Sequence, residues 1–178
     1  NMTYPLFKQK GAGKELWMTE VYVPDSSSSA DAWPNALQVA VNMNNAFAIG
    51  DMQAYVWWYI RRSYGPMKED GSISKRGYCM AQYSKFVRRG YKRVDATMNP
   101  SSKVYVSAFK GDGKAVIVAT NDTDSTYTQK FNVTNGNIKK VDRYRTSASE
   151  NLAATRADET TVWPDNDLLP DDFDTNYT

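Results

Sequence analysis

The stretch that decides the fold is "QAYVWWYIRRSYGPM", residues 53–67. Residues 54–60 are all apolar or aromatic, and a continuous apolar run of this length predicts a short strand buried on both faces, which we place at residues 52–60. Two arginines and a loop with several breakers follow. So many rings beside two guanidinium groups indicate either an aromatic core strand or the lining of a site for a flat, polar and acidic ligand.

Neighbouring residues of a strand face opposite ways, and this divides the side chains of the run into two sets. One face is predicted to carry Tyr55, Trp57 and Tyr59, and the other Val56, Trp58 and Ile60. We expect one set to pack against helices and the other to lie on the opposite side of the strand. A core role is the simpler interpretation for Tyr55 and Tyr59.

The rest of the front half alternates strand and helix signals. "ELWMTEVYV", residues 15–23, predicts another short buried strand. Apolar positions at helical spacing in residues 33–47 predict a helix between the two strands, with Ser29 as its N-cap and Gly50 at its end. A second helix is predicted for residues 74–87. Nearly continuous apolar strands that alternate with helices are typical of parallel pairing in an α/β domain.

The back half changes to short strands separated by turn signals, which predicts an antiparallel sandwich. The strands are expected at residues 103–110, 114–120, 126–133 and 138–145. We therefore predict an α/β plus all-β chain, with residues 1–95 in the first domain and 96–178 in the second. The acidic tail, from about residue 164, is expected to be poorly structured or truncated.

Composition narrows the possible chemistry. The 178 residues carry a net charge of +2, which gives no strong case for nucleic acid or a membrane surface. The chain has no histidine and one cysteine, Cys79, which argues against histidine-based nucleophiles, most catalytic zinc sites and intrachain disulfides. No metal or organic cofactor is predicted. Acid/base chemistry would fall to carboxylates, Tyr or Lys, and glycoside hydrolysis is where two carboxylates suffice.

Three stretches, residues 14–24, 53–78 and 80–97, resemble glycoside hydrolase family 30, in particular its bacterial glucuronoxylanases. The resemblance runs from about Tyr4 to about Val141. It implies the last two βα units of a (β/α)8 TIM barrel, with an appended antiparallel side β-sandwich domain. It also implies cleavage of β-1,4-xylan by the retaining mechanism, and thus a secreted enzyme whose partner is an acidic polysaccharide.

The resemblance places the catalytic nucleophile on Glu20, the last residue of "WMTE". The position suits this role, because Glu20 lies near the end of an apolar strand, and barrel strands carry catalytic side chains at their carboxyl ends. The family's acid/base lies in an Asn-Glu motif, and this dipeptide does not occur in the chain. We therefore expect the chain to be a fragment, inactive by itself, whose missing barrel half lies in the same or another polypeptide.

The resemblance also implies recognition of a 4-O-methylglucuronic acid branch of xylan. The residues at matching positions are Arg62, Trp58, Tyr64, Tyr22 and Ser29. Arg62 is expected to hold the carboxylate, because a planar guanidinium can bind it with two hydrogen bonds. A core role for Arg62 is disfavoured, because a buried guanidinium needs a paired anion. Arg61 is expected to be structural or to face solvent.

Two alternatives stay open. A chain with only one carboxylate of the catalytic pair could be a non-catalytic xylan-binding or remnant protein. A family member could also have another specificity, such as that of a glucosylceramidase or a β-1,6-glucanase, although Arg62 would then lack an obvious ligand.

Overall fold

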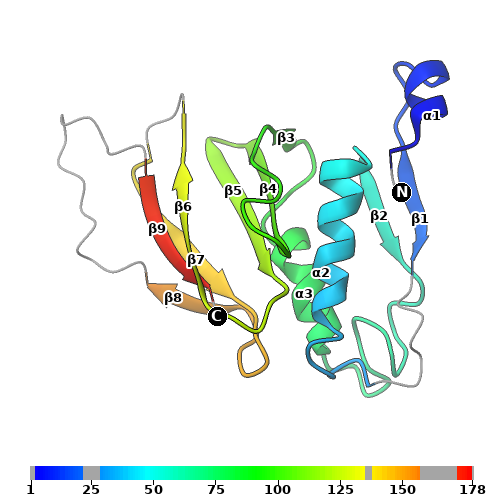
Figure 1. Ribbon diagram of the computed structural model, residues 1–178. Coiled ribbons are helices and arrows are strands. Elements are labelled where there is room, and N and C mark those ends of the chain that lie inside the picture. The colour runs from blue at the N-terminus through cyan, green and yellow to red at the C-terminus, as the bar shows by residue number, and fades with distance from the viewer. Residues whose placement is uncertain (1–2, 22–28, 135–137, 157–171, 178) are drawn as a thin grey trace. The chain divides into compact units, whose positions relative to one another are not determined.

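The computed structural model describes residues 3–21, 29–134, 138–156 and 172–177 (Figure 1). By compactness the chain divides into two units, Asn1–Asp122 and Thr123–Thr178. None of the helices in the described ranges combines the length and apolar character that a membrane crossing requires. The structure confirms a mixed α/β region followed by antiparallel strands.

The first unit is built on two parallel strands, as the sequence predicts. After a short helix that was not predicted, α1 (Pro5–Lys10), strand β1 (Trp17–Val21) pairs with β2 (Ala54–Trp57). The register shifts between Met18 and Val21. Strand β2 is shorter than predicted, and β1 begins two residues later than predicted, while the predicted end of β1 at residues 22–23 lies outside the described residues. The amide of Trp58 still bonds to β1, but beyond Trp58 the chain hydrogen-bonds within its own loop, where the amide of Met67 donates to the carbonyl of Ile60 at 2.9 Å.

The helix between these strands begins later than predicted. It consists of α2 (Leu37–Asn44) and a π-helical turn, η1 (Asn45–Ile49). Its N-cap position is Ala36, so the prediction that Ser29 caps this helix is wrong. The hydroxyl of Ser29 instead accepts a hydrogen bond from the amide of Asp31, two residues further on. The predicted end at Gly50 is confirmed.

Helix α3 (Lys75–Ser84) starts where the sequence predicts. Ser74 is its N-cap, and the Ser74 hydroxyl accepts a hydrogen bond from the amide of Gly77 at 3.1 Å. Gly77 is required at this point, because a Cβ there would lie 2.1 Å from the carbonyl oxygen of Pro66. The first turn of α3 is therefore in close contact with the loop that follows β2.

Three antiparallel strands complete the first unit: β3 (Lys92–Val94), β4 (Val104–Gly111) and β5 (Lys114–Asn121). Asp112 and Gly113 both have positive φ, as the tight turn between β4 and β5 requires. The buried core lies between α2, α3, β2 and this sheet. Its members include Val39, Met43, Trp57, Cys79, Tyr83, Phe109 and Val118. The domain boundary predicted from the change in sequence pattern, between residues 95 and 96, falls within this unit and stays a prediction.

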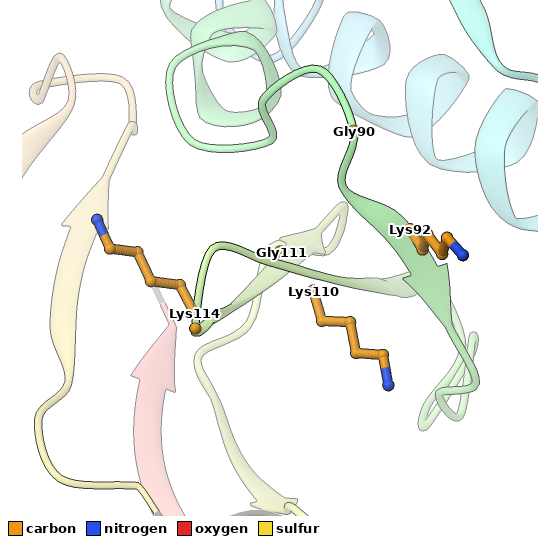
Figure 2. A pocket seen from close by; sticks show the side chains of 6 residues that line it. Gly90, Lys92, Lys110, Gly111 and Lys114 are labelled. Atoms are coloured by element: carbon orange, nitrogen blue, oxygen red, sulfur yellow. The ribbon is translucent and has the colours of Figure 1, made fainter.

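A shallow hollow of about 420 Å³ lies beside the β4–β5 turn (Figure 2). It is lined by Gly90, Lys92, Lys110, Gly111, Gly113 and Lys114. Lys92 and Lys110 are register partners, so they share one face of the sheet. Lys114 is paired with Gly111, one residue further along, and therefore lies on the other face. Because the lysines do not converge, as Figure 2 shows, the hollow does not form an anion site.

The second unit contains two antiparallel pairs. Strand β6 (Tyr127–Asn132) pairs with β9 (Asp172–Tyr177), and β7 (Asp142–Arg145) pairs with β8 (Ala153–Arg156). The tail was expected to lack structure from about residue 164, and β9 corrects this for residues 172–177. Asp and Asn disfavour strands, but pairing with β6 along the whole of β9 outweighs that preference.

Candidate active site

The carboxyl ends of β1 and β2 lie side by side. Val21 is the register partner of Trp57, and the amide of Trp58 donates to the carbonyl of Val21 at 2.8 Å. The two strands are parallel, so the segments that follow them leave from the same edge. The structure thus brings the strand that carries Glu20 next to the segment that carries the predicted recognition residues.

Glu20 is exposed and is the last residue but one of β1. Its neighbour Val21 packs against the core cluster with α2 and α3. Glu20 itself is exposed, so its carboxylate is not part of that core. An accessible carboxylate at this edge is what a nucleophile needs. The catalytic role of Glu20 itself stays a prediction.

The alternation predicted for the strand 52–60 is confirmed up to its end. Trp57 is 7% exposed and lies in the core, whereas Val56 is 47% exposed and Trp58 is 44% exposed. The expectation of a core role for Tyr59 is wrong. Tyr59 follows the end of β2 and is 42% exposed, with its ring centroid 4.4 Å from that of Trp58. The pair forms an exposed aromatic surface where β2 ends.

Arg62 lies in the loop after β2 with its side chain 47% exposed. The guanidinium carbon is 4.5 Å from the ring centroid of Tyr59, a cation–π contact, and Nη1 is 3.8 Å from Oε1 of Glu69. The prediction that Arg62 is not a core residue is confirmed, because about half of this side chain is exposed to solvent. The guanidinium has five N–H donors and, among the described residues, only one long ionic contact, to Glu69, so donors remain that could bind a ligand carboxylate.

Arg61 has the structural role that was predicted. Its Nε donates to the backbone carbonyl of Glu69 at 3.0 Å, and Nη2 donates to the same oxygen. The amide of Arg62 also donates to the carbonyl of Met67 at 3.0 Å. The loop that presents Arg62 is therefore closed by hydrogen bonds between its own residues.

Tyr64 is half-buried, and its backbone is anchored on α3. Nη1 of Arg76 donates to the carbonyl of Tyr64 at 2.9 Å, and the side chain of Arg76 is fully buried. The hydroxyl of Ser74 donates to the next carbonyl, that of Gly65, at 2.7 Å. Helix α3 therefore fixes the backbone of the segment that follows Arg62.

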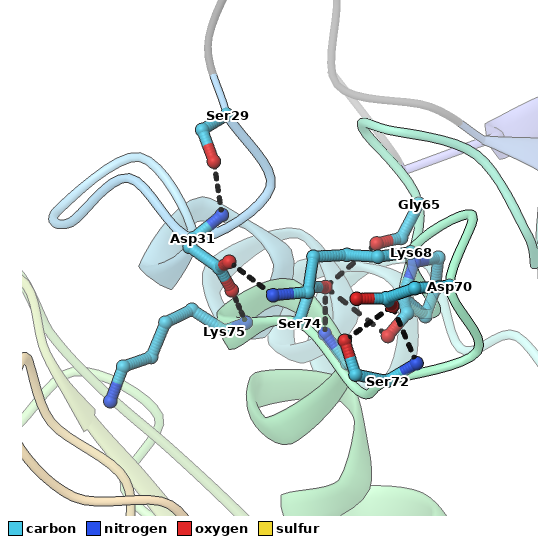
Figure 3. Close-up of polar contacts among 10 residues, drawn as sticks. Ser29, Asp31, Gly65, Lys68, Asp70, Ser72, Ser74 and Lys75 are labelled. Carbon is cyan, nitrogen blue, oxygen red and sulfur yellow. Dashed lines mark hydrogen bonds and ion pairs between the residues drawn. The ribbon is translucent and has the colours of Figure 1, made fainter.

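Ser29 is exposed, and Asp31 joins its segment to the loop after β2 (Figure 3). The carboxylate of Asp31 accepts from Nζ of Lys68 at 2.8 Å and from the amide of Lys75 at 3.0 Å. The hydrogen bond from Lys68 is the main cause that lowers the pKa of Asp31 below its ordinary value. Tyr22, the remaining predicted residue, lies outside the described residues.

Four residues around the site were not predicted from the sequence: Tyr59, Glu69, Asp31 and Arg76. Asp31 had a weak local signal, because Ser-x-Asp segments favour side-chain turns. Arg76 had no local sequence signal for its buried position, because an arginine near the start of a helix normally faces water. Both are identified only by contacts between residues distant in the sequence.

Cys79 is confirmed as a small buried residue, and burial raises the pKa of its thiol to about 12. Burial also raises the pKa of Tyr55 and of Tyr83, so neither phenol can act as a base near neutral pH. In the described ranges, the structure brings together no group of three or more Cys, Asp or Glu that could hold a metal ion.

Comparison with known proteins identifies the class. No model of a protein family matches the chain. It is 65% identical over 150 residues to the glucuronoxylanase XynC of Bacillus subtilis strain 168, covering 84% of this chain and 36% of that protein. A second Bacillus subtilis glucuronoxylanase XynC is 63% identical over the same length, with the same coverage.

Solved structures agree. A family 30 endoxylanase from Clostridium papyrosolvens C71 matches with a TM-score of 0.84 and 41% identity, over 99% of this chain and 42% of that one. The family 30 subfamily 8 xylanase Xyn30A of Clostridium acetobutylicum matches with a TM-score of 0.79 and 34% identity, over 97% and 42%.

The proteins that the chain matches are glycoside hydrolases. The chain belongs to glycoside hydrolase family 30 and is similar to the glucuronoxylanases of that family. It spans about a third of the length of the curated relatives it matches.

Proposed function

We propose that this chain is the C-terminal part of a retaining endo-β-1,4-xylanase that acts on glucuronic-acid-decorated xylan. In this proposal β1, β2, α2 and α3 are the last two βα units of a (β/α)8 barrel, and the antiparallel strands belong to a side β-domain. The parallel β1–β2 pair, covered by helices on one face and exposed on the other, supports the barrel assignment. A polymeric substrate outside the cell implies that the enzyme is secreted.

Glu20 is the proposed nucleophile. In a retaining enzyme its carboxylate attacks the anomeric carbon, while a second carboxyl group about 5–5.5 Å away protonates the leaving oxygen and later activates water. We propose that this acid/base lies in a part of the protein outside residues 1–178, because the chain has no Asn-Glu dipeptide.

Arg62 is the proposed determinant of substrate choice. The observation that carries the proposal is its half-exposed guanidinium, held over Tyr59 in a loop that leaves the same sheet edge as β1. A branch carboxylate would accept two hydrogen bonds from the guanidinium. Trp58 supplies an exposed aromatic plane, and the hydroxyls of Tyr64, Ser29 and Tyr22 are proposed to contact the sugar acid.

The test compares Arg62→Ala with Arg62→Lys in the full-length natural protein that contains this sequence. We expect Arg62→Ala to lower kcat/KM on glucuronoxylan about 30- to 1,000-fold, since it removes a charge-assisted bidentate pair. Arg62→Lys should restore little, because an ammonium group cannot replace the planar fork. Activity on undecorated xylan should change far less. Equal losses on the two substrates would contradict the proposal.

The alternative function is that of a non-catalytic xylan-binding protein. One assay on the full-length natural protein distinguishes the hydrolase from the non-catalytic binding protein. Binding of decorated xylan without release of reducing ends supports the non-catalytic protein, whereas release of reducing ends supports the hydrolase.

A further inference from the structure

One carboxylate joins the segment that follows β1 to the connection between β2 and α3 (Figure 3). Oδ2 of Asp31 accepts from Nζ of Lys68 at 2.8 Å, and Oδ1 accepts from the amide of Lys75 at 3.0 Å. Lys68 lies in the loop that carries Arg62, and Lys75 is the first residue of α3. Asp31 therefore holds that loop and the start of α3 at the same time.

The backbone beside Asp31 makes the same connection. The amide of Ala30 donates to the carbonyl of Ser63 at 3.3 Å, and the amide of Arg76 donates to the carbonyl of Ala30 at 3.1 Å. Ala30 is fully buried between them. Residues 29–31, which we call the strap, thus lie between the Arg62 loop and the first turn of α3.

The strap also orients the hydroxyl of Ser29. The amide of Asp31 donates to Oγ of Ser29 at 3.1 Å. A hydroxyl has one hydrogen to donate and two lone pairs, so this bond uses a lone pair and leaves the hydrogen for an anion. Because Ala30 is bonded to Ser63, the residue after Arg62, the donors of Ser29 and Arg62 are carried by segments that are fixed to each other.

We propose that Asp31 is a positioning residue that sets the specificity for the acidic branch by holding Ser29 in register with Arg62 and Tyr64. This inference rests on the proposed function, and Asp31 itself does not touch the substrate. The Asp31–Lys68 pair is partly exposed, with 43% and 35% of the two side chains accessible. Its direct effect on stability is therefore small. A shift of one donor by a fraction of an ångström weakens a multidentate contact much more.

The test uses the full-length natural protein with Asp31→Ala, Asp31→Asn and the matched control Asp70→Ala. Asp70 lies in the same loop, but its carboxylate accepts from Ser72, two residues away, through the amide at 2.9 Å and the hydroxyl at 2.6 Å. We expect Asp31→Ala to raise KM for glucuronoxylan about 3- to 10-fold, with kcat nearly unchanged and no change on undecorated xylan. Asp31→Asn keeps an oxygen acceptor and should be intermediate, and Asp70→Ala should behave as wild type.

Other results overturn the inference. If Asp31→Ala changes KM equally for both substrates, or no more than Asp70→Ala does, Asp31 has no positioning role.

A second variant covers the case in which Asp31→Ala does not fold. Lys68→Met removes the ion pair while the bond to the Lys75 amide remains, and the same selective rise in KM is expected. Arg62→Ala in the same assay tests the proposed function separately from the positioning role of Asp31. If Arg62→Ala does not distinguish the substrates, both proposals fail. If it does and Asp31→Ala does not, only this one fails.

Discussion

The two faces of the β1–β2 pair differ sharply, although apolar and aromatic side chains lie on both. On one face Trp57 packs with Tyr83 and Phe109 in a closed core. On the other face Val56, Trp17 and Trp58 are about half exposed. Apolar side chains gathered in this way normally mark a surface that another part of a protein covers. The closed face accounts for the stability of the unit, and the open face and the strand ends are where function is expected.

The largest expected effect lies at the open strand end. Glu20→Gln in the full-length natural protein should lower kcat on glucuronoxylan about a thousandfold or more, because an amide cannot form the glycosyl-enzyme intermediate. The matched control is Glu15→Gln, just before the same strand, which keeps an oxygen acceptor for Nε1 of Trp17. If Glu20→Gln retains more than about a tenth of the activity, Glu20 is not the nucleophile.

The stability costs of truncating two valines, one in the closed core and one on the open face, compare the two faces directly. Val39 is fully buried in the core cluster, and Val39→Ala should cost about 2 kcal/mol in the free energy of unfolding. In the full-length natural protein Val56→Ala should cost nearly as much, because a closed barrel would cover Val56. Denaturant unfolding of both variants measures this. A cost below about 0.5 kcal/mol for Val56→Ala, typical of a surface position, would contradict the barrel.

The smallest expected effect concerns the counter-ion of Arg62. Glu69 competes with a ligand carboxylate for the guanidinium across its 3.8 Å contact. Glu69→Gln should therefore lower KM for glucuronoxylan about two- to threefold, as expected for the loss of an exposed ion pair. The gain should shrink at high salt and be absent on undecorated xylan. A higher KM would show instead that Glu69 holds Arg62 in its binding position.

Local signals predicted the elements whose causes are local. The apolar runs gave the parallel pair, Ser74 gave the start of α3, and the Gly-Asp-Gly sequence gave the β4–β5 turn. The family resemblance supplied the candidate residues, and the structure places Trp58, Arg62 and Tyr64 in one loop beside the strand of Glu20.

The features that sequence reasoning missed depend on partners far along the chain. Ser29 has the residue type of an N-cap, but its segment is held by the β2–α3 connection and the helix starts later. Strand β9 forms because β6 offers it an edge, not because its own residues favour a strand. Arg76 is buried because it bonds a loop carbonyl, which no helical periodicity reveals.

The loop after β2 has a consequence for how specificity can change. Its path is set by bonds to backbone atoms, from Met67 to Ile60, from Arg61 to Glu69 and from Arg76 to Tyr64. The side chains of residues 62 and 64 take no part in those bonds. They can therefore be exchanged while the scaffold beneath them keeps its shape, and a ligand that binds there has little chain entropy to overcome. Substitutions at residues 62 and 64, natural or designed, can therefore alter which ligand binds at this loop without a change in the fold.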